Sequence, residues 1–350
     1  MKKSLLALAV LTAFAGAASA QSSVTIGGKL DLAAGKMIGT ADKGLFDTPG
    51  SRLNFGGVED LGGGLRAVFG IEHRLNPDDG TYVGNFWNGY SWVGLSGGFG
   101  TLRLGRDYTS AFIMVQNQVD PFGGDTVAAL RPALLAGTAK VRFGNGAKYF
   151  TTMGGLTASV DISEGNKNNT GATDTSVANR PWSGSLTYAA GPVWLGFSHE
   201  NPGGKNDKLT TAGARFAMGP AVLRAGTSFG NNAANAKVKG YLVGANIRMG
   251  AGDFKLGYAT MKVAGTTTMA KIGVGYHYDL SKRTKIYADF GRDSKVAVQK
   301  TGYDIGVLGD DGQEVGPDQI GNIVIRLPLP PGTLTTLWHN DAGYEKSYLN

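Results

Sequence analysis

The sequence predicts an all-β fold, a 16-stranded antiparallel transmembrane β-barrel. About sixteen short segments alternate apolar and polar residues between Ser22 and Val307, and Ile286, Ala288 and Phe290, for example, fall on one face. Each segment is near the length with which a tilted strand crosses a bilayer, and none is apolar enough to cross as a helix. Short turns also alternate with long polar loops, which is the layout of an outer-membrane barrel.

Residues 1–20 have the pattern of a secretory signal peptide. Lys2 and Lys3 precede an apolar stretch at 5–15, and small residues at 18–20 form a cleavage site. An N-terminal membrane anchor is the alternative, but the apolar run is short and ends at that site. We therefore expect cleavage after Ala20 and export to the cell outer membrane, where a chain without spanning helices must close into a barrel.

The predicted strands are bounded by Gly, Asn and Asp, which are turn-forming residues. Tight turns are expected at 60–63, 96–98 and 250–252, and long loops at 35–50 and 164–181. The strands are 23–34, 51–58, 64–73, 89–96, 99–106, 145–151, 156–163, 182–190, 192–200, 208–217, 220–229, 237–248, 252–261, 268–278, 283–292 and 300–307.

A soluble β-sandwich would show the same alternation. Sixteen strands are too many for one ordinary sandwich, and aromatic residues lie near strand ends, as in the interfacial girdles of membrane barrels. These aromatic residues are Trp92, Phe99, Trp182, Tyr188, Trp194, Tyr258, Tyr276 and Tyr278. The signal peptide also favours the barrel.

Composition argues against several functions. The chain has 350 residues with 56 Gly and no Cys, which excludes disulfides, thiolate nucleophiles and Cys-ligated zinc. The four His residues lie far apart without metal-ligand spacing, and the Gly-rich runs precede no helix that would bind phosphate. An exported chain without a basic run does not predict nucleic-acid binding. We therefore expect no enzyme, no cofactor, no metal and no nucleic-acid partner.

Residues 107–140 form the longest predicted connection. This stretch has apolar residues at 111–115 and a Pro- and Gly-containing run at 120–126. A loop exposed to water rarely contains such an apolar run, and loops of this length are usually functional. We expect this segment to fold back into the barrel, with its apolar part against the inner wall.

Several motifs resemble the general bacterial porins. Residues 105–108 and 121–125 (GRDY and PFGGD) look like their inward-folded third external loop, and residues 51–67 are similar to their second hairpin. Residues 93–96 and 99–101 resemble the next hairpin. The resemblance covers about 21–307 and is greatest to the neisserial and β-proteobacterial porins.

This resemblance implies a homotrimer of sixteen-stranded barrels, each narrowed by the inserted loop. It also implies that basic and acidic groups face one another across the narrow gap. At one position, where the family often has a pore-facing Arg, this chain has Asn88-Gly89-Tyr90, and Arg74 on the preceding strand is a substitute. The expected constriction residues are Arg52, Arg74, Arg106, Arg142, Asp120 and Asp125.

The barrel portion is strongly basic. The whole chain has a net charge of +7, the signal peptide removes two Lys, and residues 308–350 have six acidic and two basic residues. Rings of basic groups in a narrow pore favour anions. The predicted function is a water-filled channel for passive diffusion of small hydrophilic solutes, with anion preference. Outer-membrane lipid and lipopolysaccharide are expected partners. An adhesin or receptor barrel and a non-functional chimeric porin are alternatives.

The pattern changes after Val307, and residues 308–350 form a non-porin tail. Three Pro residues within 328–331 do not fit a barrel strand. Residues 303–350 resemble a fragment of the AMP-forming acetyl- and propionyl-CoA synthetases. The resemblance is carried by 307–315, 321–325, 328–332 and 337–341. The fragment lacks that family's nucleotide loop and catalytic lysine, so no ligase activity is expected. A divergent porin terminus, a gene fusion and an assembly artefact all remain open explanations.

The tail affects barrel closure, because a barrel has no edges only when its last strand pairs with its first. Residues 300–307 could close against 23–34, but this strand is short and precedes a polar, Pro-containing segment. We expect poor outer-membrane assembly of this chain. A normal yield of heat-modifiable trimer in outer-membrane fractions would contradict that expectation.

Overall fold

The computed structural model describes residues 22–48, 50–82, 84–165, 180–296, 305–308 and 322–325. The predicted signal peptide and most of the predicted 164–181 loop lie outside these residues. The chain divides into two units, of which the smaller contains 39–43 and the segment from residue 298 onward. Within the described ranges, no helix is both long and apolar enough to span a membrane.

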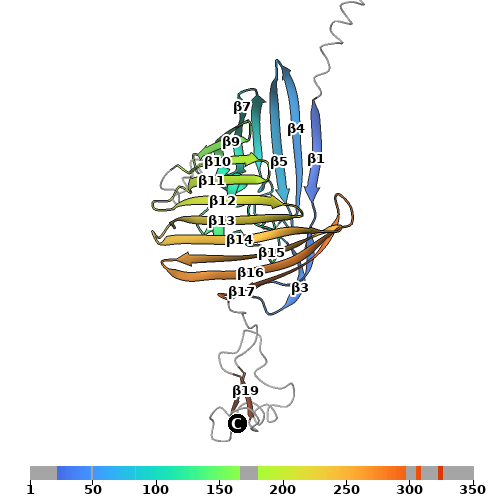
Figure 1. The fold of residues 1–350 in the computed structure, drawn as a ribbon, viewed down its shortest axis with the longest axis vertical. Coiled ribbons are helices and arrows are strands. Elements are labelled where there is room, and N and C mark those ends of the chain that lie inside the picture. Colours follow the sequence, from blue (N-terminus) through green and yellow to red (C-terminus); the bar gives the residue numbers. More distant parts are fainter. Residues whose placement is uncertain are drawn as a thin grey trace, which may run out of the picture. The chain divides into compact units, whose positions relative to one another are not determined.

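The larger unit is built on one antiparallel sheet of fifteen strands (Figure 1). Each strand pairs with the next along the chain, apart from the β2–β3 hairpin inserted after β1. The strands are β1 (Ser23–Lys29), β4 (Arg52–Gly62), β5 (Leu65–Arg74), β6 (Ser91–Gly97), β7 (Gly100–Tyr108), β8 (Arg142–Met153), β9 (Leu156–Ser163), β10 (Trp182–Ala190), β11 (Val193–Asn201), β12 (Lys208–Met218), β13 (Ala221–Asn231), β14 (Lys237–Met249), β15 (Gly252–Val263), β16 (Thr266–Asp279) and β17 (Lys285–Asp293).

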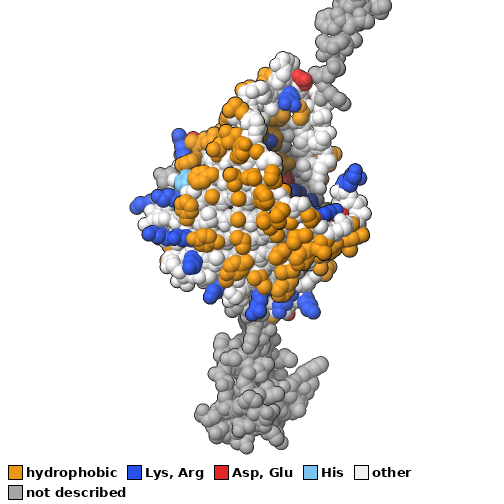
Figure 2. All heavy atoms as spheres, in the orientation of Figure 1, with side chains coloured by type: hydrophobic (Ala, Val, Ile, Leu, Met, Phe, Trp, Pro, Cys, Tyr) orange, Lys and Arg blue, Asp and Glu red, His pale blue; other side chains and the backbone are white. Residues whose placement is uncertain are grey.

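The alternation in sequence separates the two faces of this sheet. On β9, Val160 is exposed while its neighbours Ser159 and Asp161 are buried, and the same pattern occurs on β11, where Phe197 is exposed beside buried Ser198. Figure 2 shows hydrophobic side chains gathered over the outer face of the strands, with Lys and Arg toward the margins. One face is therefore apolar and exposed, and the other is polar and covered.

The polar face of the sheet is covered by the segment between β7 and β8, here called the inserted segment (residues 109–141). It contains a short π-helical turn, η1 (Phe112–Gln116), and one short helix, α2 (Pro132–Leu135). Its apolar residues form the main buried cluster together with residues of β14–β16. The cluster consists of Val119, Phe122, Ala128, Leu130, Ala133 and Leu134 from the segment and Leu242, Ala259 and Met269 from the strands.

Glycines on β11–β17 let the inserted segment approach the sheet closely. These glycines, here called the glycine track, are Gly196, Gly213, Gly226, Gly240, Gly244, Gly257, Gly273 and Gly291. A Cβ added at Gly240 would lie 1.9 Å from the Ala133 carbonyl oxygen, and one at Gly291 would lie 2.3 Å from that of Val127. Side chains at these positions would occupy the volume that the segment fills, which explains part of the high glycine content.

Three predictions about the strands need correction. The predicted strand 23–34 is two strands, β1 and β2 (Leu32–Lys36), and β2 pairs with β3 (Lys43–Asp47) inside a predicted loop. Residues 300–304 of the predicted strand 300–307 lie outside the described residues, and its remaining residues belong to β18 (Ile305–Leu308), which pairs with β19 (Asn322–Ile325) and not with the sheet. Within the described residues, β1 and β17 therefore remain the two ends of the fifteen-stranded sheet.

Two of the aromatic residues assigned to interfacial girdles face the covered side instead. The Trp92 ring lies 3.9 Å from the Arg103 guanidinium carbon, and Trp194 packs against the buried cluster under the inserted segment. The other six are exposed, consistent with their predicted positions. Strand-end location alone could not distinguish the two faces, because Trp is amphipathic and occurs on both.

Candidate functional site

A gap of about 650 Å³ lies beside the inserted segment, at the start of β4, the end of β5 and the start of β8. Arg52, Arg74 and Arg142 line it from the strands, and Asp125 and Arg131 line it from the inserted segment. Four of the six expected constriction residues thus surround one gap. Arg131 was not predicted, because it lies in an irregular part of the segment where sequence periodicity gives no orientation.

Glu72 connects two of the arginines. The Arg74 Nε atom lies 2.8 Å from Glu72 Oε1, and the Arg52 Nε atom lies 3.7 Å from Glu72 Oε2. Arg52 and Arg74 are register partners on β4 and β5, and Glu72 is two residues from Arg74, so all three side chains share a face. Glu72 is 4% exposed, so one buried carboxylate holds two partly exposed guanidinium groups at the gap.

Tyr108 brings the third arginine into the same network. Its hydroxyl accepts a hydrogen bond from Arg142 Nη2 at 2.8 Å and another from Arg74, and it lies 3.2 Å from Glu72 Oε1, to which it donates. The Arg142 guanidinium carbon also lies 4.4 Å from the centre of the Tyr108 ring, a cation–π geometry. Three positive charges are therefore fixed around one negative charge.

On the opposite side of the gap, positive and negative charges are more nearly equal in number. Asp125 Oδ2 lies 3.2 Å from Lys29 Nζ, and Lys29 Nζ also lies 2.8 Å from Asp31. Arg131 is held by the main chain, since it donates to the carbonyls of Gly123 at 3.0 Å and Gly124 at 3.2 Å. Gly124 has a φ of +79°, in the left-handed region that favours glycine, and a Cβ there would also meet this guanidinium.

Asp120 does not lie at the gap, which corrects its expected role. It is 3% exposed, and its carboxylate accepts backbone N–H bonds from Phe122 at 2.9 Å and from Leu130 and Arg131 at 2.7 Å each. Burial raises the pKa of Asp120, while these three donors act in the opposite direction. Asp120 therefore closes a turn of the inserted segment, because its oxygens are used inside it.

Arg106 also departs from its expected position. Its guanidinium donates to the Asn88 carbonyl and to Asn88 Oδ1, both at 3.1 Å. It pairs in register with Ser91 on β6, one residue out of phase with the inward-facing Trp92, and it lies inside a β-bulge toward β8, where the register shifts between Gly105 and Asp107. The GRDY motif located this arginine near the site but could not reveal the bulge that redirects it.

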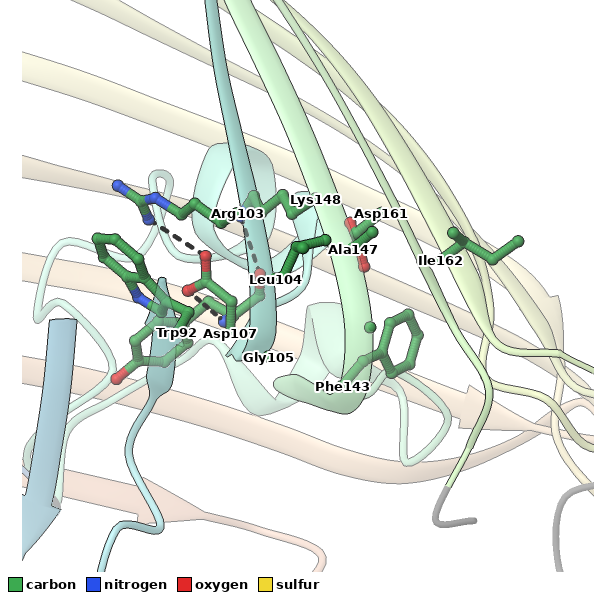
Figure 3. A pocket seen from close by; sticks show the side chains of 12 residues that line it. Trp92, Arg103, Leu104, Gly105, Asp107, Phe143, Ala147, Lys148, Asp161 and Ile162 are labelled. Atoms are coloured by element: carbon green, nitrogen blue, oxygen red, sulfur yellow. Dashed lines mark hydrogen bonds and ion pairs between the residues drawn. The ribbon is translucent and has the colours of Figure 1, made fainter. Parts of the chain in front are cut away.

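Buried polar contacts fix the start of the inserted segment, and Figure 3 shows Arg103, Asp107, Lys148 and Asp161 close to one another there. Lys148 Nζ donates to the Tyr108 carbonyl at 2.8 Å, and Asp161 accepts from the Ser110 N–H at 2.6 Å. Arg103 lies over the Trp92 ring and donates to Asp107 at 3.1 Å. These contacts position Tyr108 and, through it, the arginines.

A second space of about 930 Å³ extends the basic lining. It shares Arg52 and Asp125 with the gap and is also lined by Lys29, Lys255, Arg283 and Lys285. Among the described residues, no group of three or more His, Asp or Glu side chains could hold a metal ion. The geometry offers an open space between charged walls.

A family profile, a curated protein and a solved structure that resemble this chain are all described as porins. The profile of the Gram-negative porin family matches residues 7–297. The chain is 35% identical over 316 residues to outer membrane porin protein 32 of Delftia acidovorans, covering 83% of this chain and 88% of that protein. An anion-selective porin from Comamonas acidovorans superposes with a TM-score of 0.66 at 27% identity, covering 78% of this chain and 90% of the other.

Two further matches give less information, because one is of low sequence identity and the other is short. A trimer form of OmpT from Vibrio cholerae has a TM-score of 0.59 at 13% identity over 84% of this chain and 93% of its own, a likeness of fold alone. A stretch of 48 residues, 14% of this chain, is 48% identical to an uncharacterized protein of Pseudomonas aeruginosa, of which it covers 8%.

Proposed function

Because this chain belongs to the Gram-negative porin family, we propose that it forms a water-filled channel for passive diffusion of small hydrophilic solutes, with preference for anions. Its location in the cell outer membrane and its non-enzymatic character follow from the family. The exposed apolar face of the strands then contacts lipid, and the covered polar face borders the channel.

The arrangement of Arg52, Arg74 and Arg142 around a single Glu72 carries the anion preference. Charges lining a narrow aqueous pore between low-dielectric walls act strongly, because the walls focus their field. Asp125 faces these arginines but is itself paired with Lys29. The lining therefore keeps an excess of positive charge at its narrow part.

Removing the three arginines tests this proposal. In the combined variant Arg52→Ser, Arg74→Ser and Arg142→Ser, Glu72 and Asp125 remain, so we expect the preference to turn toward cations. The anion-to-cation permeability ratio should fall by roughly tenfold, since lining charges generate potentials of several kT. Reversal potentials across planar bilayers in a KCl gradient measure it, and the difference should shrink toward 1 M salt, where the Debye length is about 3 Å.

Arg106→Ser is the matched control. This arginine is bound to Asn88 and does not line the gap, so its removal should change the permeability ratio little. A cation preference in the unaltered channel would refute the proposed selectivity. An equal effect of Arg106→Ser would show that overall charge, and not the gap, sets the preference.

We also propose that the functional unit is a homotrimer whose partners include outer-membrane lipid and lipopolysaccharide. The trimer form of the OmpT relative supports the assembly by fold alone. Small anionic or hydrophilic molecules are the proposed solutes. Cross-linking of the protein in native membranes, followed by denaturing electrophoresis, tests the stoichiometry.

We further propose three parts of the chain: a cleaved signal peptide at 1–20, the porin region at 21–307 and a non-porin tail at 308–350. The porin profile ends at residue 297, before the proposed tail begins. This end of the profile supports a porin region followed by a different segment. The acyl-CoA synthetase-like nature of that segment, and hence a chimeric chain, is proposed from the sequence motifs of 303–350. Sequencing the locus across codons 295–315 tests it, and an intact downstream porin end would indicate an artefact.

A further inference from the structure

One wall of the gap is aromatic. Tyr90, Tyr108 and Phe112 line the gap beside the charged residues described above. The Tyr108 and Phe112 rings are nearly parallel, with 12° between their planes and 5.5 Å between their centres. The Tyr90 ring is tilted by 58° against the Tyr108 ring, with 6.2 Å between their centres. Both separations are typical of aromatic pairs in contact, so the three rings form one surface, here called the aromatic wall.

Two rings of the aromatic wall are engaged by arginines. The Arg142 guanidinium carbon lies 4.4 Å from the centre of the Tyr108 ring, and that of Arg131 lies 4.9 Å from the centre of the Phe112 ring. A cation held over a ring occupies a face of that ring through cation–π attraction. These two rings therefore serve mainly to position the arginines.

Tyr90 differs from them, because it lies between the barrel wall and the gap. It is half-buried and packs over Gly70 on β5, where an added Cβ would lie 2.9 Å from the Tyr90 ring carbon Cε2. The absence of a side chain at Gly70 lets the ring lie close to the sheet. Tyr90 thus presents an aromatic surface to whatever occupies the gap.

Positive charge lies beside this ring. The Glu72 N–H donates to the Tyr90 carbonyl at 2.8 Å, so Tyr90 adjoins the residue whose carboxylate pairs with Arg52 and Arg74. The Arg52 side chain is the more exposed of the two, at 33% against 15%. It donates to the Gly50 carbonyl at 3.2 Å, and its contact with Glu72, at 3.7 Å, is longer than an ordinary hydrogen bond. A guanidinium has five N–H donors in a fork that fits a carboxylate, so Arg52 keeps donors for a solute.

We propose that the gap selects, among the solutes of the anion channel proposed above, carboxylates that carry a planar aromatic ring. Arg52 binds the carboxylate, and the solute ring packs against Tyr90. The gap, at about 650 Å³, has the size of a small-molecule site, and such sites combine apolar and aromatic lining with a few polar groups that fix orientation. A small inorganic anion contacts the arginines alone, whereas an aromatic carboxylate contacts the arginine and the aromatic wall together.

Block of the chloride current tests this selection. The full chain is reconstituted in planar bilayers, and the concentration that halves the chloride current is measured at constant ionic strength for benzoate, cyclohexanecarboxylate and benzamide. Cyclohexanecarboxylate has the same charge and a ring of similar size that is neither planar nor aromatic. Benzamide keeps the aromatic ring without the charge. Benzoate should half-block at a concentration roughly two- to tenfold lower than either of the others, which is the range that an aromatic pair contributes.

Three substitutions locate the contact. Tyr90→Leu removes the ring and should abolish the difference between benzoate and cyclohexanecarboxylate, whereas Tyr90→Phe keeps the ring and should preserve it. Tyr241→Leu is the matched control, because Tyr241 is 47% exposed on the outer face of β14. It should leave the difference unchanged. The three solutes are compared on the unaltered chain as well, so a folding failure of Tyr90→Leu does not remove the test.

Half-block by cyclohexanecarboxylate or benzamide at the same or a lower concentration than benzoate would overturn the proposal, because apolar burial or the ring alone would then account for binding. A folded Tyr90→Leu that retains the difference would overturn it too. An anion-preferring channel that fails these comparisons refutes the aromatic selection alone. A cation preference in a KCl gradient refutes instead the selectivity on which it rests.

Discussion

Gly240→Leu is expected to displace the inserted segment and to raise single-channel conductance severalfold. A Cβ at this position would lie 1.9 Å from the Ala133 carbonyl oxygen and 2.6 Å from Ser228 Oγ. The first obstacle is backbone that cannot rotate away, so α2 must move from the wall. Overpacking of this kind costs about 1–3 kcal/mol. The strands are joined to one another by continuous ladders of backbone hydrogen bonds, whereas the inserted segment is mostly irregular. The segment should therefore move before the sheet does, and its movement should widen the gap.

Gly184→Leu is the control for this result. It adds the same side chain on β10, where an added Cβ would have its nearest heavy atom 3.9 Å away. We expect unaltered conductance in planar bilayers for this variant. If Gly240→Leu folds to the same extent and conducts as the unaltered chain does, the glycine track does not seat the segment.

The second large effect is expected from Glu72→Gln. The carboxylate is shared between Arg74 at 2.8 Å and Arg52 at 3.7 Å and accepts from Tyr108 at 3.2 Å. The amide keeps the shape but removes the charge that these donors require. Hydrogen bonds to charged groups contribute about 1.5–3 kcal/mol, so we expect the free energy of unfolding to fall by about this amount. Urea titration in detergent micelles measures the change.

The same substitution should increase anion preference, because the arginines lose their neutralising partner. Glu164→Gln is the control, since its ion pair with Arg180 is exposed on both sides and such pairs contribute about 0–1 kcal/mol. Loss of stability no larger than in Glu164→Gln would mean that Glu72 does not organise the arginines. A shift toward cations would contradict the charge argument.

Strand positions could be predicted from the sequence because membrane barrels impose a strict period of two. Fifteen of the sixteen predicted segments correspond to strands of the sheet, and the long apolar connection is the inserted segment. Of the sixteenth, only 305–307 falls among the described residues, and there Ile305–Leu308 pairs with β19 instead of with the sheet. Which strand a given segment pairs with depends on strand edges that are distant in sequence, and the alternation of apolar and polar residues does not determine it.

The site was only partly predictable for a related reason. Arg52 and Arg74 lie on regular strands, where period and register fix the face of each side chain. Arg106 adjoins a bulge, and Asp120 lies in an irregular turn that uses its carboxylate internally. Glu72, which holds two of the arginines, carried no motif, and Tyr108 belonged to the GRDY motif without a predicted role.

The sequence by itself determined the strand period, the apolar outer face, the basic character of the barrel region and the membership of its family. Tertiary structure alone decided which charges meet at the gap and how glycines let the inserted segment pack against the sheet. Period and composition are local properties of the chain. The gap and the glycine track depend on contacts between residues far apart in sequence, whose geometry is fixed only when the sheet curves and the segment packs against it.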